Sequence, residues 1–130
     1  MVMKKKQFWK FAILFLTMAP LNVYAHARLK SALPIPNSVV LASDSPTKIS
    51  LTFSEDIEAA FSKIQVRANL VQGPVVPEIK DAKVSQVPDK KNVLEVQLTS
   101  ALKPGRYFVV WKVTSVDTHK SNGNYAFTIK

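Results

Sequence analysis

The chain has 130 residues, of which 47% are hydrophobic and 21% are charged, and its formal net charge is +9. This composition is typical of one globular domain, and it excludes a disordered polyampholyte and a multi-pass membrane protein. The chain has no cysteine, three glycines and two histidines, His26 and His119. These counts exclude a disulfide framework, a zinc ribbon, a thiol nucleophile and a three-histidine metal site within one chain.

Residues 1–25 are predicted to be a cleaved secretory signal peptide. Lysines and no acid occupy residues 1–10, an apolar run follows at 11–18, and Val23 and Ala25 are small residues at a cleavage site. The apolar run is shorter than the roughly 20 residues that span a bilayer, and Pro20 follows it, so an uncleaved membrane anchor is the less favoured alternative. Cleavage would leave residues 26–130 with a net charge of +5. We therefore expect a secreted protein without stable membrane insertion after cleavage.

The rest of the chain is predicted to form short β-strands. Apolar and polar residues alternate with a period of two, which is the pattern of half-buried strands. The longest such segment places Tyr107, Val109, Trp111 and Val113 on one face. The expected strands are 28–31, 39–41, 48–54, 63–68, 75–79, 92–99, 106–115 and 123–130.

Turn-forming residues separate these strands and indicate the fold class. Expected turns and loops are 34–38, 69–74, 87–92 and 103–105, whereas 55–62 forms either one helical turn or a loop crossing between sheets. About seven short strands predict an all-β fold, a small antiparallel Ig-like sandwich. Residues 102–107 resemble a tyrosine corner, in which the Tyr107 phenol bonds back to the preceding loop.

Asp117-Thr118-His119 is the first candidate for chemistry. If residues 116–120 are extended, positions 117 and 119 project to the same face, so a carboxylate and an imidazole converge. The alternative is an aspartate that caps a turn near an exposed histidine.

His26 is the second candidate, because cleavage after Ala25 would make it the first residue. A terminal histidine can chelate a metal through its amine and its Nδ1, and the amine loses its proton readily to a metal near neutral pH. Together with His119 it would supply three nitrogens in a T, which suits Cu(II). Asp117 could add an oxygen ligand or hold a water, and the alternative for His26 is a disordered terminus.

Residues 26–130 resemble the periplasmic copper-resistance protein C family (CopC, PcoC and YobA-like proteins). The segments that carry the resemblance, in order and spacing, are HARLKS at 26–31, PIPNS at 34–38, ISLTFSE at 49–55, FS at 61–62, LKPGRY at 102–107, VVWKVTSVDTH at 109–119 and GNYAFTI at 123–129.

The resemblance implies a Greek-key β-sandwich or barrel that binds Cu(II) in the periplasm. The ligands implied are the amine and imidazole of His26, with Asp117 and His119; Glu55 is a further candidate beside the site. Some family members also bind Cu(I) in a methionine-rich loop. Residues 69–83 contain no methionine, and all three methionines lie within the predicted signal peptide. We therefore expect one Cu(II) per chain and no Cu(I) site.

The expected function is a monomeric periplasmic Cu(II)-binding protein, not an enzyme, that sequesters copper or delivers it to an inner-membrane transporter of the CopD type. One alternative is a histidine-brace copper oxidase, which is disfavoured because such enzymes need a broad substrate platform on a larger domain. Another is a metal-free Ig-like assembly module. No nucleic-acid partner is expected, because the lysines of residues 26–130 are scattered along the sequence without interleaved stacking aromatics.

Overall fold

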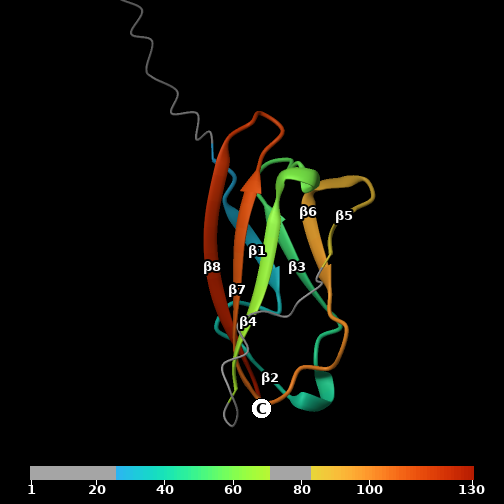
Figure 1. Cartoon of the computed structure of the whole chain (residues 1–130), viewed down its shortest axis with the longest axis vertical. Helices are drawn as coiled ribbons and strands as arrows, with labels where there is room; N and C mark the ends of the chain where they lie inside the picture. The colour runs from blue at the N-terminus through green and yellow to red at the C-terminus, as the bar shows by residue number, and fades with distance from the viewer. Residues whose placement is uncertain (1–25, 71–82) are drawn as a thin grey trace, which may run out of the picture.

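The computed structural model describes residues 26–70 and 83–130, which form two four-stranded sheets packed face to face (Figure 1). One sheet has the order β1-β3-β6-β5, and the other has the order β2-β8-β7-β4. The strands are β1 Leu29–Leu33, β2 Val39–Val40, β3 Lys48–Phe53, β4 Lys63–Leu70, β5 Val84–Val87, β6 Lys90–Gln97, β7 Gly105–Thr114 and β8 Lys120–Ile129. Two 3-10 turns complete the described elements, η1 Ala42–Asp44 and η2 Ala59–Phe61. The predicted all-β sandwich is confirmed.

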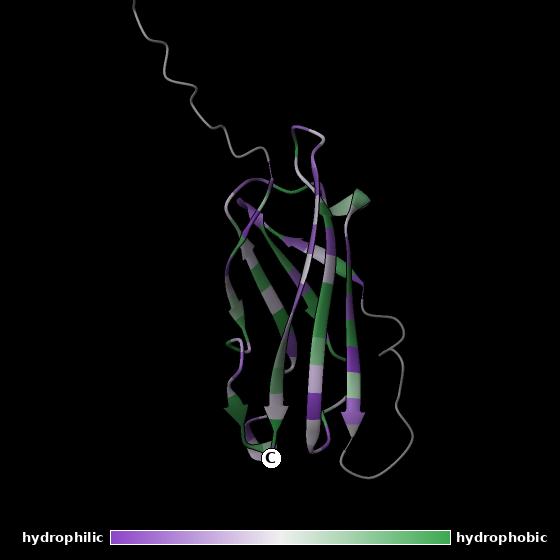
Figure 2. Ribbon diagram, turned by 90° about the vertical axis from the view of Figure 1, so that its left-hand side faces the viewer, coloured by the Kyte–Doolittle hydropathy of each residue, from purple (hydrophilic) through white to green (hydrophobic). Residues whose placement is uncertain are grey.

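Period-two alternation builds the core between the sheets, and Figure 2 shows apolar and polar bands alternating along the strands. The predicted inward face of β7 is confirmed, because Tyr107, Val109, Trp111 and Val113 are all buried. Trp111 packs edge-on to Phe53 of the opposite sheet, with ring centroids 6.3 Å apart. Its neighbour across the strands is Gly123, which leaves room for the indole ring.

Several expected boundaries differ from the structure. Residues 87–92, expected to be a loop, form a tight turn at Pro88 and Asp89 between β5 and β6, because Asp89 adopts the left-handed conformation with φ 62°. β2 pairs in parallel with β8 rather than antiparallel, over two residues. Segment 55–62 is a crossing loop that contains the single turn η2. The strand expected at 75–79 lies outside the described residues.

The expected tyrosine corner is confirmed. The Tyr107 hydroxyl donates a hydrogen bond to the carbonyl oxygen of Lys103 at 2.7 Å. Burial raises the pKa of this phenol, and the backbone hydrogen bond opposes that rise. The bond fixes the entry of the chain into β7, the strand that leads to the Asp117 turn.

Three parts of the chain meet at one end of the sandwich: the β7–β8 turn, η2 and the beginning of the described chain at His26 (Figure 1). The main-chain N–H of Glu58 donates to Thr114 O at 2.8 Å, and that of Val116 donates to Asp56 O at 3.1 Å. These bonds join the β3–η2 connection to the end of β7. Within the described residues, no helix is long and apolar enough to cross a membrane.

Candidate functional site

Asp117 and His119 come together in a closed hairpin turn rather than on an extended strand. The Ser115 N–H donates to the His119 carbonyl at 2.9 Å, and the Thr118 N–H donates to the Ser115 carbonyl at 2.8 Å. Thr118 has φ 75°, the left-handed conformation that ends three-residue hairpin loops and usually belongs to glycine. The prediction that residues 116–120 are extended is therefore wrong. The turn nevertheless brings the Asp117 carboxylate and the His119 imidazole into contact.

Both carboxylate oxygens of Asp117 are engaged within this turn. Oδ1 accepts a hydrogen bond from the Ser115 hydroxyl and a longer one, 3.4 Å, from the His119 N–H. Oδ2 lies 3.0 Å from Nδ1 of His119. The Ser115 hydroxyl holds the pKa of Asp117 below its ordinary value, against a smaller desolvation effect and with help from His119. The carboxylate is thus kept ionised beside the imidazole.

Hydrogen bonds at the two residues after His26 tie this segment to β8 and to the residue that follows β3. The Ser121 hydroxyl on β8 donates to the Ala27 carbonyl at 2.8 Å, and Ala27 is only 5% exposed. The Arg28 N–H donates to the Ser54 hydroxyl at 2.9 Å, just after β3. The beginning of the described chain is therefore held beside the β7–β8 turn, as Figure 1 shows.

The two histidines of the chain, from opposite ends of the folded region, are neighbours in space. Their ring centroids are 5.7 Å apart and the rings are nearly perpendicular, at 87°. The side chains of Asp117 and His119 are 49% and 47% exposed, so the site opens to solvent. Within residues 26–70 and 83–130, no three His, Cys, Asp or Glu side chains are close enough to form a ready-made metal cluster. Metal binding would have to draw the His26 ring toward the Asp117–His119 pair.

The chemistry of these donors fits a borderline metal ion. Because Nδ1 of His119 faces the Asp117 carboxylate, its Nε2 is left as the metal-binding nitrogen, the arrangement that orients many histidine ligands. Two imidazoles and a carboxylate suit Cu(II) better than they suit hard cations such as calcium. In the described part of the chain, no hydrogen bond or ion pair joins Glu55 to these three side chains.

Ser115 and Ser121 position the candidate ligands, and sequence reasoning did not identify them. Ser115 had a detectable signal: it continues the inward phase of Tyr107, Val109, Trp111 and Val113, and it is only 1% exposed. A hydroxyl at an apolar position needs a hydrogen-bond partner, which here is Asp117. Ser121 carried no such signal, because its partner Ala27 is distant in sequence.

Comparison with known proteins identifies the family. The model of the CopC domain matches residues 29–130, most of the chain. The chain belongs to the CopC family. The chain is 37% identical over 122 residues to the protein YobA of Escherichia coli (strain K12), covering 94% of this chain and 93% of YobA. It is also 37% identical over 111 residues to copper resistance protein C of Escherichia coli, covering 84% of this chain and 85% of that protein.

A solved structure of a CopC-family protein supports the same assignment. The crystal structure of PcoC, a methionine-rich copper resistance protein from Escherichia coli, superimposes with a TM-score of 0.69 at 35% identity. The match covers 82% of this chain and all of PcoC. The CopC-family chain described here differs in its sulfur content, since its three methionines all lie in the first 18 residues.

Proposed function

We propose that this CopC-family chain is a periplasmic Cu(II)-binding protein. The proposed ligands are the amine and imidazole of His26 and the imidazole of His119, with Asp117 as an oxygen ligand or as the group that orients His119. The observation that carries the proposal is the 5.7 Å separation of the only two histidine rings, which come from opposite ends of the folded region. Family membership and the copper-related names of the relatives support copper as the metal.

The amine of His26 becomes a ligand only after cleavage behind Ala25, so the proposal includes residues 1–25 as a signal peptide. Cleavage would also remove every methionine, which leaves nitrogen and oxygen donors but no thioether for Cu(I). We therefore propose one Cu(II) per chain and no Cu(I) site.

The proposed role is to sequester copper or to deliver it to an inner-membrane transporter of the CopD type, and not to catalyse a reaction. An exposed site suits a carrier, because a partner must reach the bound ion. Asp117 and His119 each keep about half of their side-chain surface in solvent.

A Cu(II) titration of the processed protein tests the assignment. We expect one equivalent, with a tetragonal EPR spectrum coupled to about three nitrogens. His119→Ala should weaken the affinity by orders of magnitude. Asp117→Ala should weaken it less, because the nitrogens remain. The matched control is Asp44→Ala, in the exposed turn η1. Equal affinity of the wild type and His119→Ala would remove the proposed site, and two tight equivalents would contradict the stoichiometry.

A further inference from the structure

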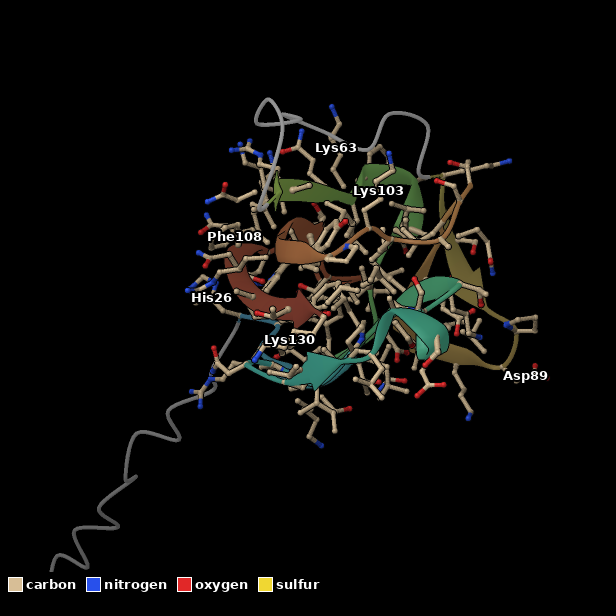
Figure 3. All side chains as sticks on the ribbon, turned by 90° about the horizontal axis from the view of Figure 1, so that it is seen from below. His26, Lys63, Asp89, Lys103, Phe108 and Lys130 are labelled. Carbon is tan, nitrogen blue, oxygen red and sulfur yellow. The ribbon has the colours of Figure 1, made fainter. Side chains whose placement is uncertain are left out.

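The outer face of the sheet β2-β8-β7-β4 gathers cationic side chains that are scattered in the sequence. Side chains on this face alternate with the buried ones along β4, β7 and β8. We call it the basic face, and its cations are Lys63, Arg67, Arg106, Lys112 and Lys120. The outward positions of these three strands carry no aspartate or glutamate. In Figure 3, Lys63 and Phe108 lie on this side of the molecule and Asp89 lies on the other.

The charges on the basic face are not neutralised by the described chain. Lys63 and Lys112 lie directly opposite each other on β4 and β7, a like-charge arrangement that destabilises a sheet. Among the described residues, none of the five cations is paired with a carboxylate. The other sheet differs, because Lys48 forms an ion pair with Glu95 at 2.8 Å. The basic face is therefore complementary to an anionic partner.

None of the described acids occupies an outward position on β4, β7 or β8, although Glu58 and Asp117 lie near the site end of the face. The described acids occupy η1, the connection between β3 and η2, the β5–β6 turn, strand β6 of the other sheet and the β7–β8 turn, at Asp44, Glu55, Asp56, Glu58, Asp89, Glu95 and Asp117. The charge asymmetry is thus a property of the fold and not of the overall composition.

Apolar side chains accompany the cations. At the site end of the basic face lies a shallow depression of about 440 Å³, whose lining includes Phe61, Lys63, Lys112 and Lys120. The Phe61 side chain is 74% exposed, which is unusual for an aromatic ring. Phe108 lies in the middle of the face, with the Arg106 guanidinium 5.4 Å from its ring centroid.

We propose that the basic face docks on the surface of an anionic phospholipid bilayer. Aromatic rings and lysines occur together at the level of lipid headgroups, where the ring meets the acyl boundary and the ammonium meets phosphate. Arg106 and Lys112 are about 20 Å apart along β7, by the usual strand rise. A fluid lipid surface can meet charges so widely spread without matching their spacing. An acidic polypeptide would have to place its carboxylates in register with them.

This inference deepens the proposed function and rests on it for its cellular setting. Lys120 follows His119 directly, so the candidate metal site lies at the edge of the basic face. Docking would hold that site close to the bilayer in which the proposed transporter resides. The binding itself requires no copper.

The test is co-sedimentation of the processed protein with phosphatidylcholine vesicles, with and without phosphatidylglycerol. We compare the wild type with Lys63→Gln/Lys112→Gln/Lys120→Gln. Each cation near an anionic surface contributes about fivefold in affinity, so the triple variant should bind about a hundredfold more weakly. The control is Lys30→Gln/Lys90→Gln/Lys91→Gln, which removes the same net charge from exposed positions on β1 and β6 of the other sheet. It should bind nearly as the wild type does.

The outcomes separate this inference from the proposed function. Binding only to phosphatidylglycerol vesicles, lost in the first triple variant and kept in the second, supports it. Equal loss in both variants would show an effect of net charge alone and overturn it. Absence of vesicle binding would overturn the inference. If polyglutamate is then bound through the same lysines, an acidic protein is the better candidate for the partner. Circular dichroism and Cu(II) affinity are measured on the wild type and on every variant. A wild type that binds vesicles but no Cu(II) overturns only the proposed function.

Discussion

Ser121→Ala tests how the fold holds His26 beside His119. The Ser121 hydroxyl is 2.8 Å from the Ala27 carbonyl, and it ties the segment that carries His26 to β8. Ala27 is only 5% exposed, so water cannot easily replace the lost donor. A hydrogen bond contributes about 1 kcal/mol net, and an unpaired buried acceptor costs about 1–3 kcal/mol. We expect the docked state of the His26 segment to be weakened by about 1–2 kcal/mol.

That change converts to a change in copper affinity. Cu(II) bound by both histidines requires the docked segment, so the apparent Kd rises as the docked population falls. A loss of 1–2 kcal/mol raises the apparent Kd by at most about fivefold to thirtyfold, and by less if the segment stays mostly docked without metal. The measurement is a Cu(II) competition titration of the processed protein, with thermal unfolding followed in parallel.

Two further variants decide whether the hydroxyl is the cause. Ser121→Thr keeps the donor and should restore most of the affinity. Ser50→Ala removes a hydroxyl from the outer face of β3, at the far end of its pairing with β1, and should change nothing. If Ser121→Ala binds Cu(II) as tightly as the wild type while His119→Ala does not, the site is correct and the tether argument is wrong.

Three other predictions concern the terminus, the turn and the core. One extra residue before His26 should turn its amine into a poorly basic amide and weaken Cu(II) binding by orders of magnitude, with circular dichroism unchanged; identical EPR parameters would contradict the amine ligand. Thr118→Asn should relieve the strain of the left-handed backbone and raise the unfolding free energy by up to about 1 kcal/mol. The melting temperature should then rise by several degrees, and an unchanged melting curve would refute this prediction. Gly123→Ala would place Cβ 2.8 Å from Cε2 and 2.9 Å from Cη2 of Trp111, so it should destabilise the fold by about 1–3 kcal/mol, whereas Asn122→Ala on the outer face should not.

The sandwich was predictable because its signal is local. Strand β7 was expected at 106–115 and is observed at Gly105–Thr114, with the predicted face buried. Period two is imposed by the pleat, so alternation within one segment is sufficient. Strand β5 was missed because its four residues, Val84–Val87, are only partly buried and too short to show a pattern.

The sequence marked the candidate residues of the site but not how the fold arranges them. Two histidines and an Asp-x-His segment marked the candidates. The left-handed conformation of Thr118 could not be inferred from them, because β-branched residues rarely adopt it. The basic face was equally hidden. Its lysines look scattered along the sequence, and only the register of β4, β7 and β8 brings them together. Such pairings between distant segments are what a reading of single segments leaves out.

If the chain carries copper as proposed, the half-open turn around Asp117 and His119 has a consequence for the kinetics of transfer. About half of each side chain faces solvent, so a donor group of an acceptor protein could approach an ion bound at the proposed site while His26 is still attached. Copper would then pass through a shared complex by stepwise ligand substitution, without release of the free ion. The transfer rate should rise with acceptor concentration and exceed the rate of spontaneous dissociation into a chelator that is too bulky to enter.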